Sequence, residues 1–117
     1  MDYEWFQDQQ ALNYLTSLTP LQNFYQTQQR LASGYTHDGQ PLTDYEHPSM
    51  YATSLAYFQF VHPEIAQELY SHKIITLYSN DTNAFKSELN YYEQNWVWFG
   101  IALYTHSLPN LYSQGKI

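Results

Sequence analysis

The chain has 117 residues, enough for one small domain, and 44% of them are apolar, so a hydrophobic core can form. The 11 acidic and 4 basic residues give a net charge of −7, which argues against nucleic acid and anionic membrane surfaces as partners, because both are recognised through Lys and Arg. The absence of cysteine excludes disulfides and thiol catalysis.

Charged residues make up only 13% of the chain, against roughly 25% in an average globular protein. Tyr, Gln, Asn and Ser take their place, a composition that suits a neutral, hydroxyl-rich ligand. The low-charge surface of a secreted or envelope protein explains it equally well. No apolar run approaches the roughly 20 residues that span a bilayer. The acidic start MDYEWFQDQQ lacks the features of a signal peptide, so the cellular location stays open.

Hydrophobic periodicity predicts an all-α fold, and residues 1–117 are expected to form a single unit. The second and fourth predicted helices are amphipathic, whereas the third and fifth are apolar on nearly all sides and should be buried on most of them. Residues 34–48 are predicted to form a long loop with a turn at Asp38-Gly39, and residues 79–85 a shorter loop. The predicted helices span residues 3–18, 20–32, 49–61, 63–78 and 91–107.

The alternation of amphipathic and fully apolar helices is typical of stacked α-hairpins in which one helix of each pair lies inside a ring or solenoid. A simple bundle would instead place one apolar stripe on every helix. Gly100 falls within the fifth predicted helix, where glycine costs up to about 1 kcal/mol relative to alanine. The close approach of a neighbouring helix would justify that cost.

The segment YYEQNWVWFGIALYTHSLPNL, residues 91–111, resembles the C-terminal end of glycoside hydrolase family 8, which contains endoglucanases, chitosanases and xylan-acting enzymes. The shared features are paired tyrosines followed by a polar residue, an aromatic–glycine stretch and a short turn containing Leu-Pro-Asn. Residues 34–57 add a Tyr-x-x-Asp-Gly turn, a loop and a Pro-Ser-x-Tyr-Ala helix start. The resemblance implies part of an (α/α)6 toroid and inverting hydrolysis of β-linked polysaccharide, with no cofactor.

The chain departs from the family where catalysis takes place. Neither the Ser-Glu-Gly-Gln-Gly-Tyr-like segment that carries the general acid nor the Asp-x-x-Arg-x-Pro segment that carries the base is present. No residue is therefore assigned as catalytic, and the chain alone is predicted to lack glycosidase activity. A piece of a ring would also expose apolar faces of its inner helices, with oligomerisation or aggregation as the expected consequence.

The resemblance points to Tyr91, Tyr92 and Asn95 as substrate-binding residues, because tyrosines at the matching positions line the sugar cleft. Core packing of the two tyrosines is an equal alternative, as is helix capping by Asn95. Trp96, Trp98 and Phe99 are expected in the core. The partner would be an oligosaccharide or polysaccharide, and the alternatives to an enzyme fragment are a non-catalytic saccharide-binding module and a helical protein-interaction module.

The remaining ionisable residues are expected to be structural. Inverting hydrolysis needs two carboxyl groups roughly 6.5–9.5 Å apart, and none of the candidates stands at a family catalytic position, so capping or solvation is expected for each. The histidines lack the spacing of a metal site, and none is predicted. The carboxylates considered are Asp38, Asp44, Glu46, Glu88 and Glu93.

Overall fold

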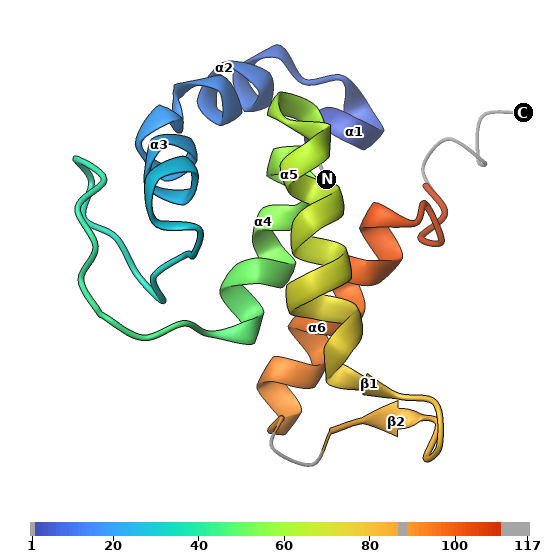
Figure 1. Cartoon of the computed structure of the whole chain (residues 1–117). Coiled ribbons are helices and arrows are strands. Elements are labelled where there is room, and N and C mark those ends of the chain that lie inside the picture. Colours follow the sequence, from blue (N-terminus) through green and yellow to red (C-terminus); the bar gives the residue numbers. More distant parts are fainter. Residues whose placement is uncertain (1, 87–88, 111–117) are drawn as a thin grey trace, which may run out of the picture.

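The computed structural model describes residues 2–86 and 89–110 and is predominantly helical, which confirms the all-α class (Figure 1). The α-helices are α1 (Asp2–Phe6), α2 (Gln9–Ser17), α3 (Thr19–Gln28), α4 (Pro48–Val61), α5 (Pro63–Leu69) and α6 (Tyr91–Tyr104). A π-helical turn, η1 (Tyr70–Ile74), and a 3-10 turn, η2 (Ile75–Leu77), continue α5, and a hairpin of two short strands, β1 (Tyr78–Ser79) and β2 (Ala84–Phe85), follows.

The central helix is α4, which packs against α6 and α5 and carries much of the core. Its side chains are buried around more than half of the helix circumference, as predicted for this segment. The helix begins at Pro48, because proline has the backbone angle of a first helical residue and needs no amide donor there. Its buried residues are Tyr51, Ala52, Ser54, Leu55, Tyr57 and Phe58.

The first predicted helix, residues 3–18, is divided in two, so that prediction was wrong. Gln7 adopts a left-handed backbone conformation with φ of 56°, and Asp8 begins a new helix. An oxygen of the Asp8 side chain accepts a hydrogen bond of 2.8 Å from the backbone N–H of Ala11. This N-cap stabilises the start of α2 because the capped amide would otherwise lack a hydrogen-bond partner. The hydrophobic periodicity of residues 3–18 continues across this point and gives no sign of the break.

The second predicted helix ends earlier than residue 32. Gln29, with φ of 55°, is left-handed and terminates α3. The loop that follows contains the predicted turn, in which Gly39 has φ of 83°. A Cβ atom at this glycine would lie 2.1 Å from the Cβ of Pro20, so both the turn and the packing of the loop on α3 require glycine.

The fourth predicted helix, residues 63–78, is confirmed as far as Leu77 and in its orientation, with a change of helix type along its length, but Tyr78 belongs to β1 and its assignment to the helix was wrong. Ile65, Ala66, Leu69 and Ile74 are buried and Tyr70 is half-buried, as the amphipathic pattern predicts. The backbone N–H of Ile75 donates to the carbonyl of Tyr70, five residues back, which defines the π turn.

Residues 79–85 were expected to be a loop without regular structure, and this was wrong at both ends of the segment. Tyr78 pairs with Phe85 and Ser79 with Ala84 in antiparallel register. The rings of Tyr78 and Phe85 meet edge to face with their centroids 5.7 Å apart. This cross-strand ring pair helps stabilise a hairpin that is too short to show an alternating pattern in the sequence.

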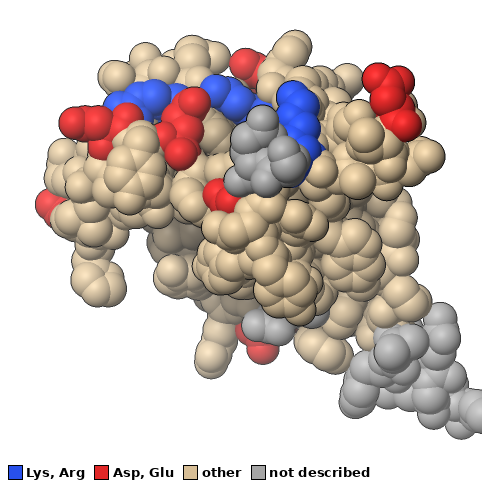
Figure 2. All heavy atoms as spheres, turned by 90° about the horizontal axis from the view of Figure 1, so that it is seen from below, with Lys and Arg blue, Asp and Glu red and all other residues tan. Residues whose placement is uncertain are grey.

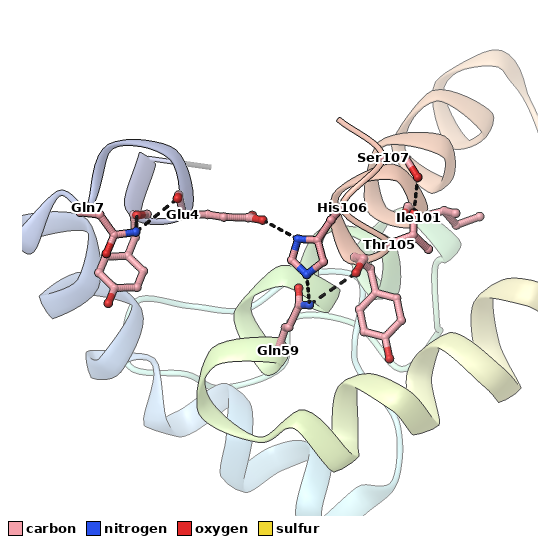
Figure 3. A network of polar contacts seen from close by, with 9 residues as sticks. Glu4, Gln7, Gln59, Ile101, Thr105, His106 and Ser107 are labelled. Atoms are coloured by element: carbon pink, nitrogen blue, oxygen red, sulfur yellow. Dashed lines mark hydrogen bonds and ion pairs between the residues drawn. The ribbon is translucent and has the colours of Figure 1, made fainter. Parts of the chain in front are cut away.

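The last helix ends at Tyr104 rather than at residue 107. His106 is left-handed with φ of 56°, and the N–H of Ser107 donates to the carbonyl of Ala102 at 2.8 Å, which closes the helix. Figure 3 shows how this end contacts α1: His106 Nδ1 lies 3.2 Å from Glu4 Oε1 and its Nε2 lies 3.3 Å from Gln59 Nε2 on α4. The contacts hold α1 against the C-terminal end of α6.

Candidate functional site, an aromatic face on α6

The start of α6 is a capping box built from Asn90 and Glu93. The Asn90 side chain accepts from the N–H of Glu93 at 2.9 Å, and the Glu93 carboxylate accepts from the N–H of Asn90 at 3.0 Å. Glu93 is buried and its Oε1 also lies 3.1 Å from Nε2 of His47. The capping role expected for Glu93 is thus confirmed, and its carboxylate is engaged in the helix start.

A close crossing of α4 and α6 sets the position of the candidate site. A Cβ atom at Gly100 would lie 2.6 Å from the backbone carbonyl oxygen of Ala52, well inside van der Waals contact. The close neighbour predicted from this mid-helix glycine is therefore present, and it is α4. The crossing brings the backbones of the two helices together and leaves the longer side chains of α6 on the other side.

The buried part of α6 is a narrow stripe formed by Glu93, Val97 and Gly100, with Ala102 buried near the C-terminal end. Trp96, Trp98 and Phe99 are exposed to solvent, so their expected place in the core was wrong. The physical reason is that, among the described residues, α6 packs mainly on α4, with a smaller contact to η1. An all-round apolar sequence can be buried on every side only where neighbours surround the helix.

The exposed rings form a continuous surface, which we call the aromatic band. Ring centroids of Tyr92 and Trp96 are 6.1 Å apart, those of Trp96 and Phe99 6.5 Å, and those of Trp98 and Phe99 5.1 Å. These separations fall within the range of favourable aromatic pairs, about 4.5–7 Å. The members of the band, with their exposed fractions, are Tyr92 (60%), Trp96 (39%), Trp98 (51%) and Phe99 (43%), and Tyr91 (85%) lies beside them on the first turn of α6.

The three residues predicted to bind substrate lie together on the first turns of α6. Tyr91 and Tyr92 are exposed, and within residues 2–86 and 89–110 neither hydroxyl has a hydrogen-bond partner. Core packing is therefore wrong for both tyrosines. Asn95 is half-buried, and its Nδ2 donates to the carbonyl of Tyr91 at 2.7 Å, so its side chain is not a cap and its amide is partly engaged.

An apolar groove of about 460 Å³ runs beside the aromatic band. Its floor contains the small residues Ala52, Ala56 and Gly100 at the crossing of α4 and α6, and Trp96 and Phe99 form one side. The groove was not predicted from the sequence. The small residues Ala52 and Ala56 were nevertheless a signal for it, because residues four apart lie on the same face of a helix. The other lining residues are Tyr3, Leu15, Thr53, Tyr57, Phe60 and Leu103.

A polar cluster lies on a different part of the surface, where the loop before α4 meets η1. Lys73 Nζ donates to Glu46 Oε1 at 2.8 Å, and the hydroxyl of Tyr51 donates to the same carboxylate oxygen. Tyr51 also accepts from the backbone N–H of Leu31 at 3.1 Å. Figure 2 shows Lys and Arg gathered along one edge of the molecule, with Asp and Glu side chains beside them.

The described residues whose carboxylates were considered from the sequence are separate from one another in the structure, and Asp44 makes its contact through its backbone carbonyl. Glu46 belongs to the polar cluster, and Asp38 accepts from the Thr36 hydroxyl in the loop turn. The carbonyl of Asp44 accepts from Arg30 at 3.3 Å, while Glu88 lies outside the described residues. Each described carboxylate therefore has the structural or solvated role expected of it, and no catalytic role is assigned to any of them.

The contacts of Glu46 predict an acid-sensitive contribution to stability. Burial raises the pKa of this carboxyl, but hydrogen bonds from Lys73 and Tyr51 outweigh burial and hold the pKa below its ordinary value. A carboxyl with a lowered pKa in the folded state stabilises the fold above its unfolded-state pKa of about 4.3, and this contribution is lost as the pH falls through the lower folded value.

We therefore expect Glu46→Gln to cost up to about 1 kcal/mol at pH 7, the size typical of an exposed ion pair, and almost nothing near pH 2. Urea unfolding of both proteins at a series of pH values measures the difference. Asp44→Asn is the matched control, since its backbone carbonyl makes the contact with Arg30 and its cost should be small throughout. An equal penalty for Glu46→Gln at every pH would contradict the assignment.

No described group of three or more His, Asp and Glu side chains is arranged to bind a metal ion. The described helices also include none that is long and apolar enough to cross a membrane.

Comparisons with protein-family models, with curated proteins and with solved structures gave no match.

Proposed function

We propose that this chain forms the C-terminal part of an (α/α)6 glycoside hydrolase resembling family 8, which acts on β-linked polysaccharide. In this proposal α4 and α6 are inner helices of the toroid and the chain contributes a sugar-contacting surface, with the catalytic carboxylates supplied by other segments. The observation that carries it is the exposure of Tyr91 and Tyr92, side by side at the start of α6, with no partner for either hydroxyl among the described residues.

The chemistry of these two side chains fits a saccharide. A pyranose ring presents an apolar C–H face and a rim of hydroxyls, and tyrosine offers a flat apolar ring together with a polar hydroxyl. The rigid start of α6, held by the Asn90–Glu93 capping box, would keep both rings in place before the ligand arrives. Little conformational entropy would then be lost on binding.

Two further observations support the toroid. Gly100 allows α4 and α6 to approach as closely as stacked helices require, and both sequences are apolar on almost all sides. Trp96, Trp98 and Phe99 are also the surface that further helices of a ring would cover, while Tyr91 and Tyr92 stay open to the sugar. A saccharide-binding module without catalysis would use the same two tyrosines. Measurements of hydrolysis distinguish such a module from an enzyme fragment only when the rest of the ring is supplied.

The test is a titration of the chain with cello-, chito- and xylo-oligosaccharides, followed by tryptophan fluorescence, which reports on Trp96 near Tyr92. At least one series should change the emission in a saturable way. Tyr91→Ala and Tyr92→Ala should each weaken binding by about two- to tenfold, since one aromatic contact is worth roughly 0.5–1.5 kcal/mol.

Tyr14→Ala is the matched control, because Tyr14 is equally exposed, at 66%, but lies on α2. The control should bind as the unmodified chain does, and no variant should release reducing ends from the corresponding polysaccharides. The proposed sugar contact would be ruled out if none of the three oligosaccharide series changed the tryptophan fluorescence. It would also be ruled out if the fluorescence change were the same after both Tyr91 and Tyr92 had been replaced by alanine.

A further inference from the structure

The aromatic band and the apolar groove form one surface that has a raised part and a hollowed part. Trp96 and Phe99 stand out from α6 as a ridge, and directly beside them the small residues Ala52, Ala56 and Gly100 leave the groove of about 460 Å³. A ridge of one helix surface fits a groove of another when two such surfaces meet. A surface that carries both can pair with a copy of itself.

The distribution of charge favours a second copy at this surface over other parts of the chain. The net charge of −7 makes two copies repel each other in general. Between residues 90 and 105, however, Glu93 is the single Asp, Glu, Lys, Arg or His, and it is buried in the capping box. The groove lining contains none of these residues. Contact across this surface therefore brings no like charges together.

The area is sufficient for a weak pair. With maxima of about 150–250 Å² for each aromatic side chain, the exposed fractions of Tyr92, Trp96, Trp98 and Phe99 correspond to roughly 400 Å² of aromatic surface. The largest apolar patch of an ordinary monomer is about 300–600 Å², and a standard interface buries about 800 Å² per partner. The band and the groove walls together correspond to the small, weak interfaces that bury less than about 600 Å² per partner, which agrees with association in the micromolar range.

We propose that two copies of this chain associate about a two-fold axis through α6, with Trp96 and Phe99 of each copy seated in the groove of the other. Such an interface is isologous, which means that both copies use the same surface and the ridge of each copy packs into the groove of the other. The groove is lined by residues of α1, α2, α4 and α6. In the proposed dimer Tyr91 stays uncovered beside the band. The inference is independent of the proposed sugar contact, which uses Tyr91 and Tyr92.

Sedimentation velocity between about 1 and 100 μM tests the proposal. The chain should change from a species of 13.9 kDa to one of twice that mass as its concentration rises. Phe99→Glu should shift the dissociation constant upward by at least 100-fold, because it places two carboxylates in the apolar contact. Tyr14→Glu is the matched control on α2 and should dimerise as the unmodified chain does.

A mixing experiment separates a lost interface from a lost fold. Phe99→Glu and Phe99→Lys should each be monomeric alone with an unchanged helical circular dichroism spectrum, and their equimolar mixture should form a heterodimer. A chain that stays at 13.9 kDa throughout the range, a dimer indifferent to Phe99→Glu, or higher oligomers without a defined dimer would overturn the inference.

The outcome is separable from that of the sugar titration. A monomeric chain that binds oligosaccharide through Tyr91 and Tyr92 would refute the pairing and leave the proposed function standing. If the chain forms a dimer that Phe99→Glu disrupts, and no oligosaccharide binds to it, the pairing would be supported and the proposed function refuted.

Discussion

Replacing Gly100 with alanine is expected to destabilise the protein by about 3 kcal/mol, at the upper end of the cost of overpacking a core. The added Cβ would lie 2.6 Å from the carbonyl oxygen and 2.9 Å from the Cα of Ala52. These are backbone atoms of α4, so no side-chain rotation relieves the contact and the two helices must move apart. Because small domains have only about 5–15 kcal/mol of stability, the loss should be easy to measure.

Urea unfolding followed by circular dichroism and tryptophan fluorescence measures the effect. Gly34→Ala is the matched control, since a Cβ there would meet only Leu42, at 3.8 Å, which is an ordinary contact. That variant should differ from the unmodified chain by less than about 0.5 kcal/mol. If the two alanine variants unfolded at the same urea concentration, the close crossing of α4 and α6 would be wrong.

Removal of the Phe58 ring is the second change with a large expected effect. Phe58 is fully buried on α4 and contacts Tyr25 of α3, with ring centroids 5.7 Å apart, and Tyr57 at 4.9 Å. Phe58→Ala should cost about 3–5 kcal/mol, because it removes the transfer free energy of the ring and leaves a cavity among rigid neighbours. The melting temperature should fall by well over 10 °C for a domain of this size.

Phe60→Ala, two residues further along the same helix, provides the control. Phe60 is partly exposed and its main ring contact is with Tyr3 of α1, at 4.9 Å. Its loss should cost less than half as much, and it should loosen α1 without unfolding α3. Equal costs for the two variants would mean that the core is not centred on α4.

The Gly100→Ala and Phe60→Ala variants also test the candidate site. Ala52 and Gly100 form the floor of the groove, so any movement of α4 away from α6 changes the surface on which pairing is proposed. Gly100→Ala should therefore weaken self-association as well as stability, whereas Phe60→Ala alters the opposite wall. Measuring dimerisation and unfolding on the same variants would show whether the interface depends on the crossing.

The proposals together assign different parts of α6 to different tasks. Its buried stripe packs on α4, its first turn presents Tyr91 and Tyr92, and the middle of its exposed side carries Trp96 and Phe99. In a complete toroid, helices from other segments would cover the same exposed rings that a second copy covers here. The two forms of burial exclude each other. If the toroid proposal holds, adding segments that complete the ring should dissociate the dimer.

Local signals in the sequence were enough for several features. Periodicity, proline positions and glycine chemistry gave the all-α class, the extent of α4, the start of α5, the turn at Gly39 and the reason for Gly100. The break at Gln7 and Asp8 was missed because a capping interaction depends on one side chain, and an aspartate within an amphipathic pattern is read as part of the exposed face.

The sequence by itself determined which segments are helical and that α6 is too apolar to be covered only by water. Only the tertiary structure decided which side of α6 is buried, because that depends on where neighbouring helices lie, and α4 reaches α6 along the narrow stripe that contains Gly100. Trp96, Trp98 and Phe99 were therefore expected in the core and are found on the surface. Periodicity records which residues are apolar, but burial requires a partner surface. Among the described elements α4, with a smaller contribution from η1, supplies that surface on only part of α6.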